Sequence, residues 1–324
     1  MPAGTLIADR YRLLGELPAV PPRVLWQARD EWTGQLVCAT QVSMAGLSEQ
    51  EILLARYSLS REVRGAEGFQ HRHVIPPRDA VLDADDLWVI SESMPETTLA
   101  EVLVQHGMAE PEQAARWGRD IADALAAAHG AGVLHRDLHA AVVGVADDGA
   151  TVVGGFAATA LTSVGLGAGV PLHVAPELAQ GEPASPATDV FALAAMLYTA
   201  MEGREPYPAT HNRTQLLRAA SIGVITAPQR AGPLSGLLVQ MLDPEPSRRP
   251  SAAAVRDLLA QIACPPSGVP RRRRRVLIAV VLGVLVLLGG LIAALVTLGY
   301  VMQPDPSWGA ARTSARIEFE GTWR

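Results

Sequence analysis

The stretch His135–Val143 gathers several of the side chains in this sequence that could carry out proton chemistry. It reads HRDLHAAVV, so one carboxylate, Asp137, lies two residues from an imidazole on each side, His135 and His139. A carboxylate in such a loop can act as a general base that takes a proton from a hydroxyl group. It can equally be a loop residue that hydrogen-bonds to nearby backbone, as Asp often does. We expect His139 to be a solvated surface residue rather than a second base.

The cations of the sequence are all of one kind. All 27 basic residues are arginine, and the 324 residues include no lysine, so no ammonium side chain can act beside Asp137. The formal net charge of −6 argues against a general nucleic-acid-binding protein, which needs a basic face. The two cysteines, Cys38 and Cys264, cannot make a disulfide framework, which favours a reducing compartment.

The elements that must position this stretch begin with short strands. The first 94 residues contain four strand-like runs, at Arg10–Leu17, Arg23–Arg29, Leu36–Val42 and Leu87–Ser91. A helix is predicted between the last two runs, because Ser48 followed by Glu51 forms a capping box. Apolar residues then recur at a helical period, at Ile52, Ala55, Leu59, Val63 and Ala66.

From Thr98 onward the pattern is helical. Pro111 suits the first turn of a helix that continues through Glu112–His129. A second long helix is predicted to begin with Thr188 as its cap and to end at Gly203. Shorter helices are expected at Thr214–Ile222, Leu234–Leu242 and Ala252–Cys264. The sequence therefore predicts an α+β fold, with a small β-rich lobe over about residues 10–94 and a large helical lobe over about residues 98–264.

The C-terminal part of the chain has the composition of a membrane anchor. Residues 265–275 form a Pro/Gly linker that ends in five arginines, Arg271–Arg275. Residues 276–302 carry no charge over 27 positions, which is long enough to cross a bilayer with some tilt. The flanking arginines predict a single-pass protein of the cell membrane, with residues 1–264 in the cytoplasm and a short extracytoplasmic tail, residues 303–324. We expect the span and the arginines to contact membrane lipids.

Several stretches resemble, in the expected order, the motifs of protein kinases. HRDLHAAVV resembles the catalytic loop H-R-D-L-K-x-x-N, in which Asp137 takes the general-base position. Four other stretches resemble the first strand, the hinge, the end of the activation segment and the closing motif, namely Tyr11–Leu17, Leu87–Met94, Val170–Glu177 and Leu242–Ala252. With its predicted span, the chain resembles bacterial (actinobacterial) membrane-anchored serine/threonine protein kinases. The resemblance implies the two-lobed fold of that family followed by a single transmembrane helix.

The resemblance also assigns positions to the ATP site, and these hold unsuitable residues. The glycine positions of the phosphate-binding loop are occupied by Pro18, Val20 and Arg23. The position of the nucleotide-binding lysine holds Thr40, whereas Glu62 matches the helix glutamate that pairs with that lysine. Arg23 could reach phosphate as a substitute, although a solvated loop arginine is the simpler interpretation. Glu62, Thr40 and Arg23 are thus the candidate cofactor-binding residues, at a degenerate site.

The two metal-binding positions of the family are replaced as well. Val142 stands where the catalytic loop has its metal-binding Asn, and Gly155 stands where the D-F-G motif has its Asp. The resemblance therefore implies no metal ligand from this chain. Removing one transition-state contact of this kind costs about 3–4 kcal/mol. We therefore expect efficient phosphoryl transfer to be absent.

Positions that hold the large lobe together keep the family's residues. They are His135, Arg136, Phe156, Glu177, Asp189 and Arg249. By resemblance, Asp189 braces the catalytic loop and Arg249 pairs with Glu177. A scaffold that is kept beside nucleotide chemistry that is lost is typical of a pseudokinase.

Three hypotheses for function follow from this pattern. The first is a membrane-anchored, kinase-like signalling protein that binds protein partners or is phosphorylated by them, and that needs no cofactor. Its partner would be a kinase or a phosphopeptide-binding protein, and Thr159, Thr162 and Ser163 are candidate phosphosites with which Arg136 could pair. The alternative is a serine/threonine protein kinase with an atypical ATP site, in which Asp137 is the base and ATP and Mg²⁺ are cofactors. The third is a metal-independent nucleotide binder without turnover.

Overall fold

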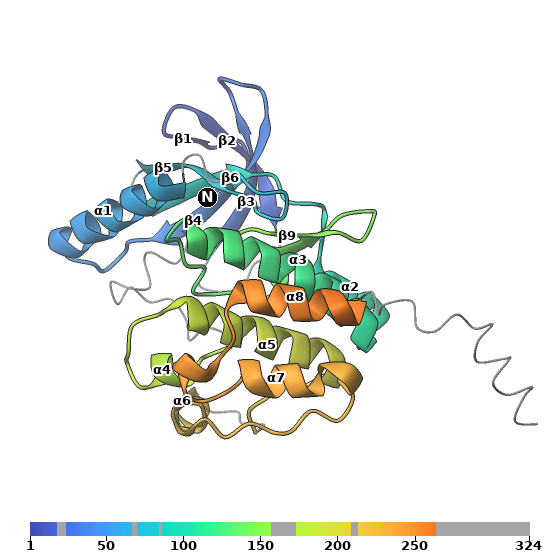
Figure 1. Ribbon diagram of the computed structural model, residues 1–324. Helices are drawn as coiled ribbons and strands as arrows, with labels where there is room; N and C mark the ends of the chain where they lie inside the picture. Colours follow the sequence, from blue (N-terminus) through green and yellow to red (C-terminus); the bar gives the residue numbers. More distant parts are fainter. Residues whose placement is uncertain (18–23, 67–69, 84–85, 157–172, 209–212, 264–324) are drawn as a thin grey trace, which may run out of the picture. The chain divides into compact units, whose positions relative to one another are not determined.

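The computed structural model describes residues 1–17, 24–66, 70–83, 86–156, 173–208 and 213–263 (Figure 1). These residues belong to one unit of the chain, Met1–Pro265, in which a strand-rich part is followed by a helical part. The predicted α+β fold with a small β-rich lobe and a larger helical lobe is therefore confirmed.

The smaller lobe is built on an antiparallel sheet with the strand order β1-β2-β3-β4-β6-β5. Its strands are β1 (Leu6–Ile7), β2 (Tyr11–Leu17), β3 (Val24–Asp30), β4 (Leu36–Ser43), β5 (Pro77–Asp83) and β6 (Asp86–Glu92). The four predicted strands are confirmed to within one residue at each end. Strand β5 was not predicted, because its letters PRDAVLD contain a proline and two acids and do not alternate cleanly.

Both faces of this sheet are covered by apolar side chains. Successive residues of a strand point to opposite faces, so Leu87 and Val89 of β6 pack in one cluster while Trp88 and Ile90 pack in another. The first cluster includes the buried face of helix α1 (Glu49–Ala66). The helix thus packs against the sheet through its apolar face.

Helix α1 begins as the sequence predicts. The backbone N–H of Ser48 donates to Oε2 of Glu51 at 2.8 Å, and the backbone N–H of Glu51 donates to Oγ of Ser48 at 3.4 Å. Ala55 and Leu59 are fully buried and Val63 is nearly so. Because Glu62 neighbours Val63, the helix presents a carboxylate at the edge of its buried face.

A small second sheet lies next to the predicted catalytic stretch. It has the order β7-β8-β9, with β7 at Thr97–Thr98, β8 at Val143–Val145 and β9 at Thr151–Val153. An isolated parallel bridge joins Val74 to Val153, so the loop before β5 also touches this sheet. Strand β8 begins directly after Val142, and β9 ends just before Gly154, so the sheet holds both segments side by side.

The larger lobe consists of helices and short 3-10 turns. Its helices are α2 (Leu99–His106), α3 (Pro111–Gly130), α4 (Pro176–Ala179), α5 (Pro186–Glu202), α6 (Arg213–Ile222), α7 (Ser235–Met241) and α8 (Ala252–Ala263). The 3-10 turns are Ala140–Val142, Gly232–Leu234 and Pro246–Arg248. All the predicted helices of this lobe are present.

One predicted boundary was wrong. Helix α5 begins at Pro186, and its N-cap is Ser185, three residues before the predicted cap, Thr188. Thr188 is instead the third helical residue, and its hydroxyl accepts the backbone N–H of Ser185 at 3.0 Å. Proline is well suited to a first helical position, because the N–H that it lacks would have no partner there. The predicted end at Gly203 is confirmed.

Helices α3, α5 and α8 form the core of this lobe and run side by side in Figure 1. They approach most closely at Gly118 of α3. A Cβ at this glycine would lie 2.7 Å from Cδ1 of Leu197 on α5 and 2.9 Å from Cδ1 of Leu259 on α8. Helix α5 is buried around most of its circumference, which explains its almost continuously apolar sequence. A rigid α5 is therefore available to support the loop that follows α3.

Candidate functional site

The loop after α3 is anchored by one buried carboxylate of α5. Asp189, which is 1% exposed, accepts the backbone N–H of His135 at 2.9 Å and that of Arg136 at 2.7 Å. Its Oδ2 also lies 2.8 Å from Nε2 of His129 at the end of α3. These bonds hold Arg136 at a φ of +66°, a conformation that is uncommon for residues other than glycine. The backbone of the loop is thus held in place by Asp189 of α5.

His135 fixes the loop from its other side. Its ring is fully buried, and its Nε2 lies 2.9 Å from the carbonyl oxygen of Gly154. The ring also packs edge-on against Phe156, with 4.8 Å between the two centroids. Phe156 is itself 2% exposed. His135 and Phe156 therefore tie the loop to the segment that follows β9.

Asp137 and His139 lie close together at the tip of this loop. Oδ2 of Asp137 is 3.9 Å from Nε2 of His139, which is too long for a hydrogen bond but within ion-pair range. The expectation that His139 is a solvated surface residue was wrong, because the whole residue is 5% exposed. The 3-10 turn Ala140–Val142 follows at once, with His139 as its N-cap residue. The side chain of Asp137 is 13% exposed.

The two positions where the family holds its metal ligands, Val142 and Gly155, lie next to each other. A Cβ added at Gly155 would lie 3.3 Å from Cγ1 of Val142, so a side chain at position 155 would have the valine as its neighbour. Gly155 has a φ of +80°, and the backbone N–H of Gly154 donates to the carbonyl oxygen of Val142 at 2.8 Å. Among the described residues, no group of three or more His, Cys, Asp or Glu side chains is placed to hold a metal ion.

Glu62 of α1 forms an ion pair with an arginine, in place of the lysine that it pairs with in the family. Its Oε1 forms an ion pair with Nη1 of Arg136, and the two side chains are 19% and 24% exposed. Its Oε2 is buried and has no hydrogen-bond partner in the described part of the chain. Thr40, at the lysine position, lies in the middle of β4 opposite Leu25 of β3 and Val89 of β6. The sequence analysis missed this ion pair, although a glutamate without its lysine was a reason to look for an arginine nearby.

The segment between β6 and β7 contacts β4 through a cysteine. The backbone N–H of Met94 lies against the thiol of Cys38. Burial raises the pKa of this thiol, and the N–H of Met94 opposes that effect only in part. The side chain of Met94 also lies over Gly154, where a Cβ would be 2.9 Å from its Sδ. Apolar and sulfur-containing side chains therefore occupy the space between the two lobes at this point.

The second polar network of the helical lobe joins α4 to the loop before α8. Nη1 and Nη2 of Arg249 donate to the two oxygens of Glu177 at 2.7 and 2.8 Å. The hydroxyl of Thr188 donates to the same carboxylate at 2.9 Å. Burial pushes the pKa of Glu177 up, but the bonds from Arg249 and Thr188 outweigh it and hold the pKa below its ordinary value. This carboxylate is therefore ionised and fully paired.

Several predicted residues lie outside the described part of the chain. They are Arg23, Thr159, Thr162, Ser163, Arg271–Arg275 and the predicted span, residues 276–302. Within the described residues, no helix is both long enough and apolar enough to cross a membrane. The membrane anchor and the phosphosites thus remain predictions.

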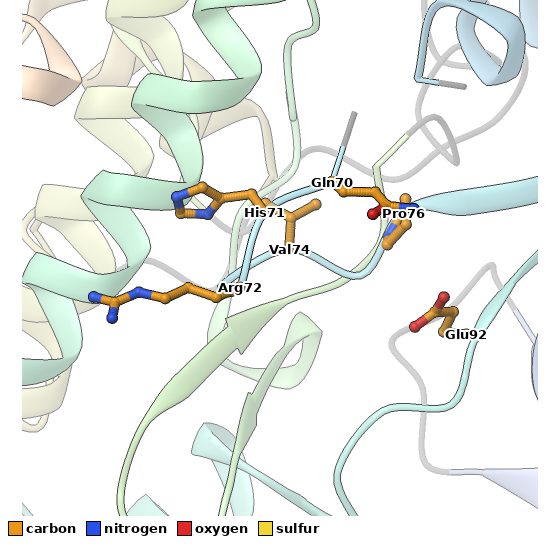
Figure 2. A pocket seen from close by; sticks show the side chains of 6 residues that line it. All are labelled: Gln70, His71, Arg72, Val74, Pro76 and Glu92. Carbon is orange, nitrogen blue, oxygen red and sulfur yellow. The ribbon is translucent and has the colours of Figure 1, made fainter. Parts of the chain in front are cut away.

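A polar hollow of about 390 Å³ lies beside the hinge (Figure 2). It is lined by Gln70, His71, Arg72, Val74, Pro76 and Glu92. Figure 2 shows Glu92, from the end of β6, on the side of Pro76, whereas the side chains of His71 and Arg72 extend away from it. No predicted site residue lines this hollow, so it is distinct from the region around Asp137.

Comparison with known proteins gives a consistent result. Residues 24–259 match the family described as the protein kinase domain. The serine/threonine-protein kinase PkaB of Streptomyces coelicolor is 33% identical over 234 residues, which cover 67% of this chain and 55% of that protein. AfsK and PkaA, two serine/threonine-protein kinases of the same organism, are 30% and 29% identical over 78% and 76% of this chain. The chain spans 55%, 31% and 48% of the lengths of these three relatives.

Proposed function

The chain belongs to the protein kinase family, and from this premise we propose that it is a membrane-anchored signalling protein whose kinase-like domain acts through protein partners rather than by efficient phosphoryl transfer. It binds those partners or is phosphorylated by them, and a kinase or a phosphopeptide-binding protein is the expected type. The observation that carries the proposal is that Val142 and Gly155 lie next to each other, without a side-chain oxygen, at the two positions where family members hold the metal.

Phosphoryl transfer depends almost entirely on positioning and on neutralising the charge of the phosphates. The described residues do not fit Mg²⁺ at this site, because Val142 and Gly155 offer no side-chain oxygen. They also leave no cation beside Glu62 except Arg136, which that glutamate already engages. A polyanionic triphosphate would lack both of its usual counter-charges here. No catalytic step through a metal is therefore derived for this chain.

The membrane part of the proposal rests on sequence alone. The five arginines before residues 276–302 support a single span with the kinase-like domain in the cytoplasm. They also support contact with anionic lipid headgroups, at about 1 kcal/mol per arginine near the surface. A domain held in this way would meet partners at the cytoplasmic side of the cell membrane.

A second candidate function is a serine/threonine protein kinase with an atypical ATP site. The names of the relatives support this candidate more directly than the first, since all three are serine/threonine-protein kinases. Asp137 supports it too, because this chain keeps a carboxylate at the general-base position. ATP and Mg²⁺ would then be its cofactors, and Arg23 would have to help hold phosphate.

Thermal unfolding of the full chain in detergent micelles separates the two candidates. We expect no rise in the melting temperature when ATP and Mg²⁺ are added. A ligand that binds only the folded state at 100 times its Kd stabilises it by about 2.7 kcal/mol, so real binding is easy to detect. Stabilisation that requires Mg²⁺, with transfer of labelled phosphate that is lost in Asp137→Asn, would establish the kinase instead. Equal stabilisation in EDTA would indicate a nucleotide binder without turnover.

A further inference from the structure

The ion pair between Glu62 and Arg136 joins two parts of the molecule that are far apart in sequence. Glu62 lies on α1, which packs on the sheet of the smaller lobe, and Arg136 lies in the loop held by α5 of the larger lobe. Among the described residues it is the only ion pair between α1 and the helical lobe. We propose that this pair is a latch that holds α1 against the helical lobe without any nucleotide.

The arginine is well placed to act as a fixed anchor. Its backbone N–H and that of His135 are both held by the carboxylate of Asp189, which sits on the rigid helix α5. The positive φ at Arg136 persists because these bonds fix the loop. The guanidinium therefore projects from a backbone that cannot easily turn away. Any movement of α1 away from the helical lobe must break the ion pair instead of dragging the loop along.

Arg136 balances a partly buried charge on Glu62 as well as donating a hydrogen bond to it. Both side chains are about four-fifths buried, so the pair is screened by salt much less than an exposed pair. Oε2 of Glu62 is buried without a hydrogen-bond partner among the described residues, so Arg136 is the group that balances this carboxylate. Without Arg136, a partly buried charge would remain uncompensated. The helix would then relax toward water to hydrate Glu62.

Thr40 explains why the latch takes this form. A lysine at its position would compete for Glu62, but threonine carries no charge, and the chain contains no lysine elsewhere. Glu62 is thus permanently available to Arg136. The latch makes the position of α1 independent of nucleotide, which suits a domain that presents one fixed surface to protein partners. This consequence rests on the proposed function, whereas the latch itself does not.

Hydrogen exchange of α1 tests the latch in the full chain, in detergent micelles and without nucleotide. We expect Glu62→Gln and Arg136→Met each to speed exchange of the α1 amides about tenfold, since the first removes the negative charge of the pair and the second removes its cationic donor. The double variant should exchange no faster than either single one, because the same contact is lost. Exchange in β6 should stay unchanged. The matched control is Arg12→Met, which breaks an exposed pair with Glu31 within the smaller lobe.

Two results would overturn the latch. The first is exchange of α1 in Glu62→Gln that stays within about twofold of the natural chain. The second is a double variant whose effect equals the sum of the two single ones. If Arg136→Met does not fold, Glu62→Gln decides alone, since its side chain keeps the same size. Adding ATP and Mg²⁺ to the natural chain tests the proposed function separately. Nucleotide binding there would contradict the proposed function. It would not affect the test of the latch, which compares variants in the absence of nucleotide.

Discussion

The helical lobe and the nucleotide positions of this domain differ in how they treat buried polar groups. In the helical lobe, Glu177 and Asp189 are almost fully buried, and each has several hydrogen-bond partners. At the nucleotide positions, the groups that would need an external partner have gone, and Val142, Gly155 and Thr40 stand in their place. For the two buried carboxylates of the helical lobe, the chain itself supplies the hydrogen-bond donors.

The contrast has a simple physical cause. A carboxylate buried without a partner is costly, and metal-binding carboxylates depend on the metal for compensation. An Asp at position 155 would need a bound metal to balance its charge and would be costly in the folded protein without one. Gly155 carries no charge that would need such a partner. The carboxylates of the scaffold carry no such risk, because Arg249 and the loop backbone are always present.

The largest effect is expected where the scaffold is broken. Arg249→Met leaves Glu177 buried and unpaired, and removing one partner of a buried ion pair costs about 3–5 kcal/mol. Urea unfolding of the full chain in detergent, followed by tryptophan fluorescence, measures the change. Arg12→Met is the control, since its exposed pair with Glu31 contributes less than about 1 kcal/mol. Equal losses in the two variants would contradict the contrast between the regions.

The pH dependence of the same variant sharpens the first result. The pKa of Glu177 is held below its ordinary value in the folded state, so its contribution to stability is complete above the unfolded pKa of about 4.3. The contribution is lost as the pH falls through the lower, folded pKa. We therefore expect the gap in unfolding free energy between the natural chain and Arg249→Met to narrow below pH 4. A difference in unfolding free energy that stays constant from pH 7 to pH 3 would mean that Arg249→Met destabilises the protein through lost packing alone.

A smaller effect is expected at the nucleotide positions themselves. Gly155→Ala forces a side chain into a φ of +80° and brings its Cβ to 3.3 Å from Val142. Left-handed backbone costs about 1–2 kcal/mol for residues other than glycine, so we expect a loss of that order in urea unfolding. Gly15→Ala is the matched control, because its Cβ would meet no atom within 4 Å and its φ is not positive. A neutral Gly155→Ala would mean that this segment is free to rearrange.

The sequence predicted the elements better than the contacts between them. The capping box of Ser48 and Glu51 and the apolar runs of the sheet are local patterns, and the structure contains both. The pair of Glu62 with Arg136 spans 74 positions, so no local pattern could reveal it. Burial of His139 likewise depends on the folded chain around it and not on its neighbours in the sequence. Sequence reasoning identified the positions, and only the fold decided their partners.

The smallest effect is expected when a single metal-binding side chain is restored. The variant Val142→Asn tests whether that one change is enough for Mg²⁺-dependent binding of ATP. Val142→Asn restores the amide at one metal position, and because Val142 is only partly buried we expect a cost of about 1 kcal/mol or less in urea unfolding. We expect no Mg²⁺-dependent stabilisation by ATP, since Gly155 and Thr40 still lack a carboxylate and a cation. Removing Arg249 from the helical lobe should strongly destabilise the folded protein. Restoring one metal-binding side chain at position 142, by contrast, should not restore nucleotide binding. A clear Mg²⁺-dependent shift in the melting temperature of Val142→Asn would reverse that conclusion, because it would mean that the remaining ligands come from elsewhere in the chain.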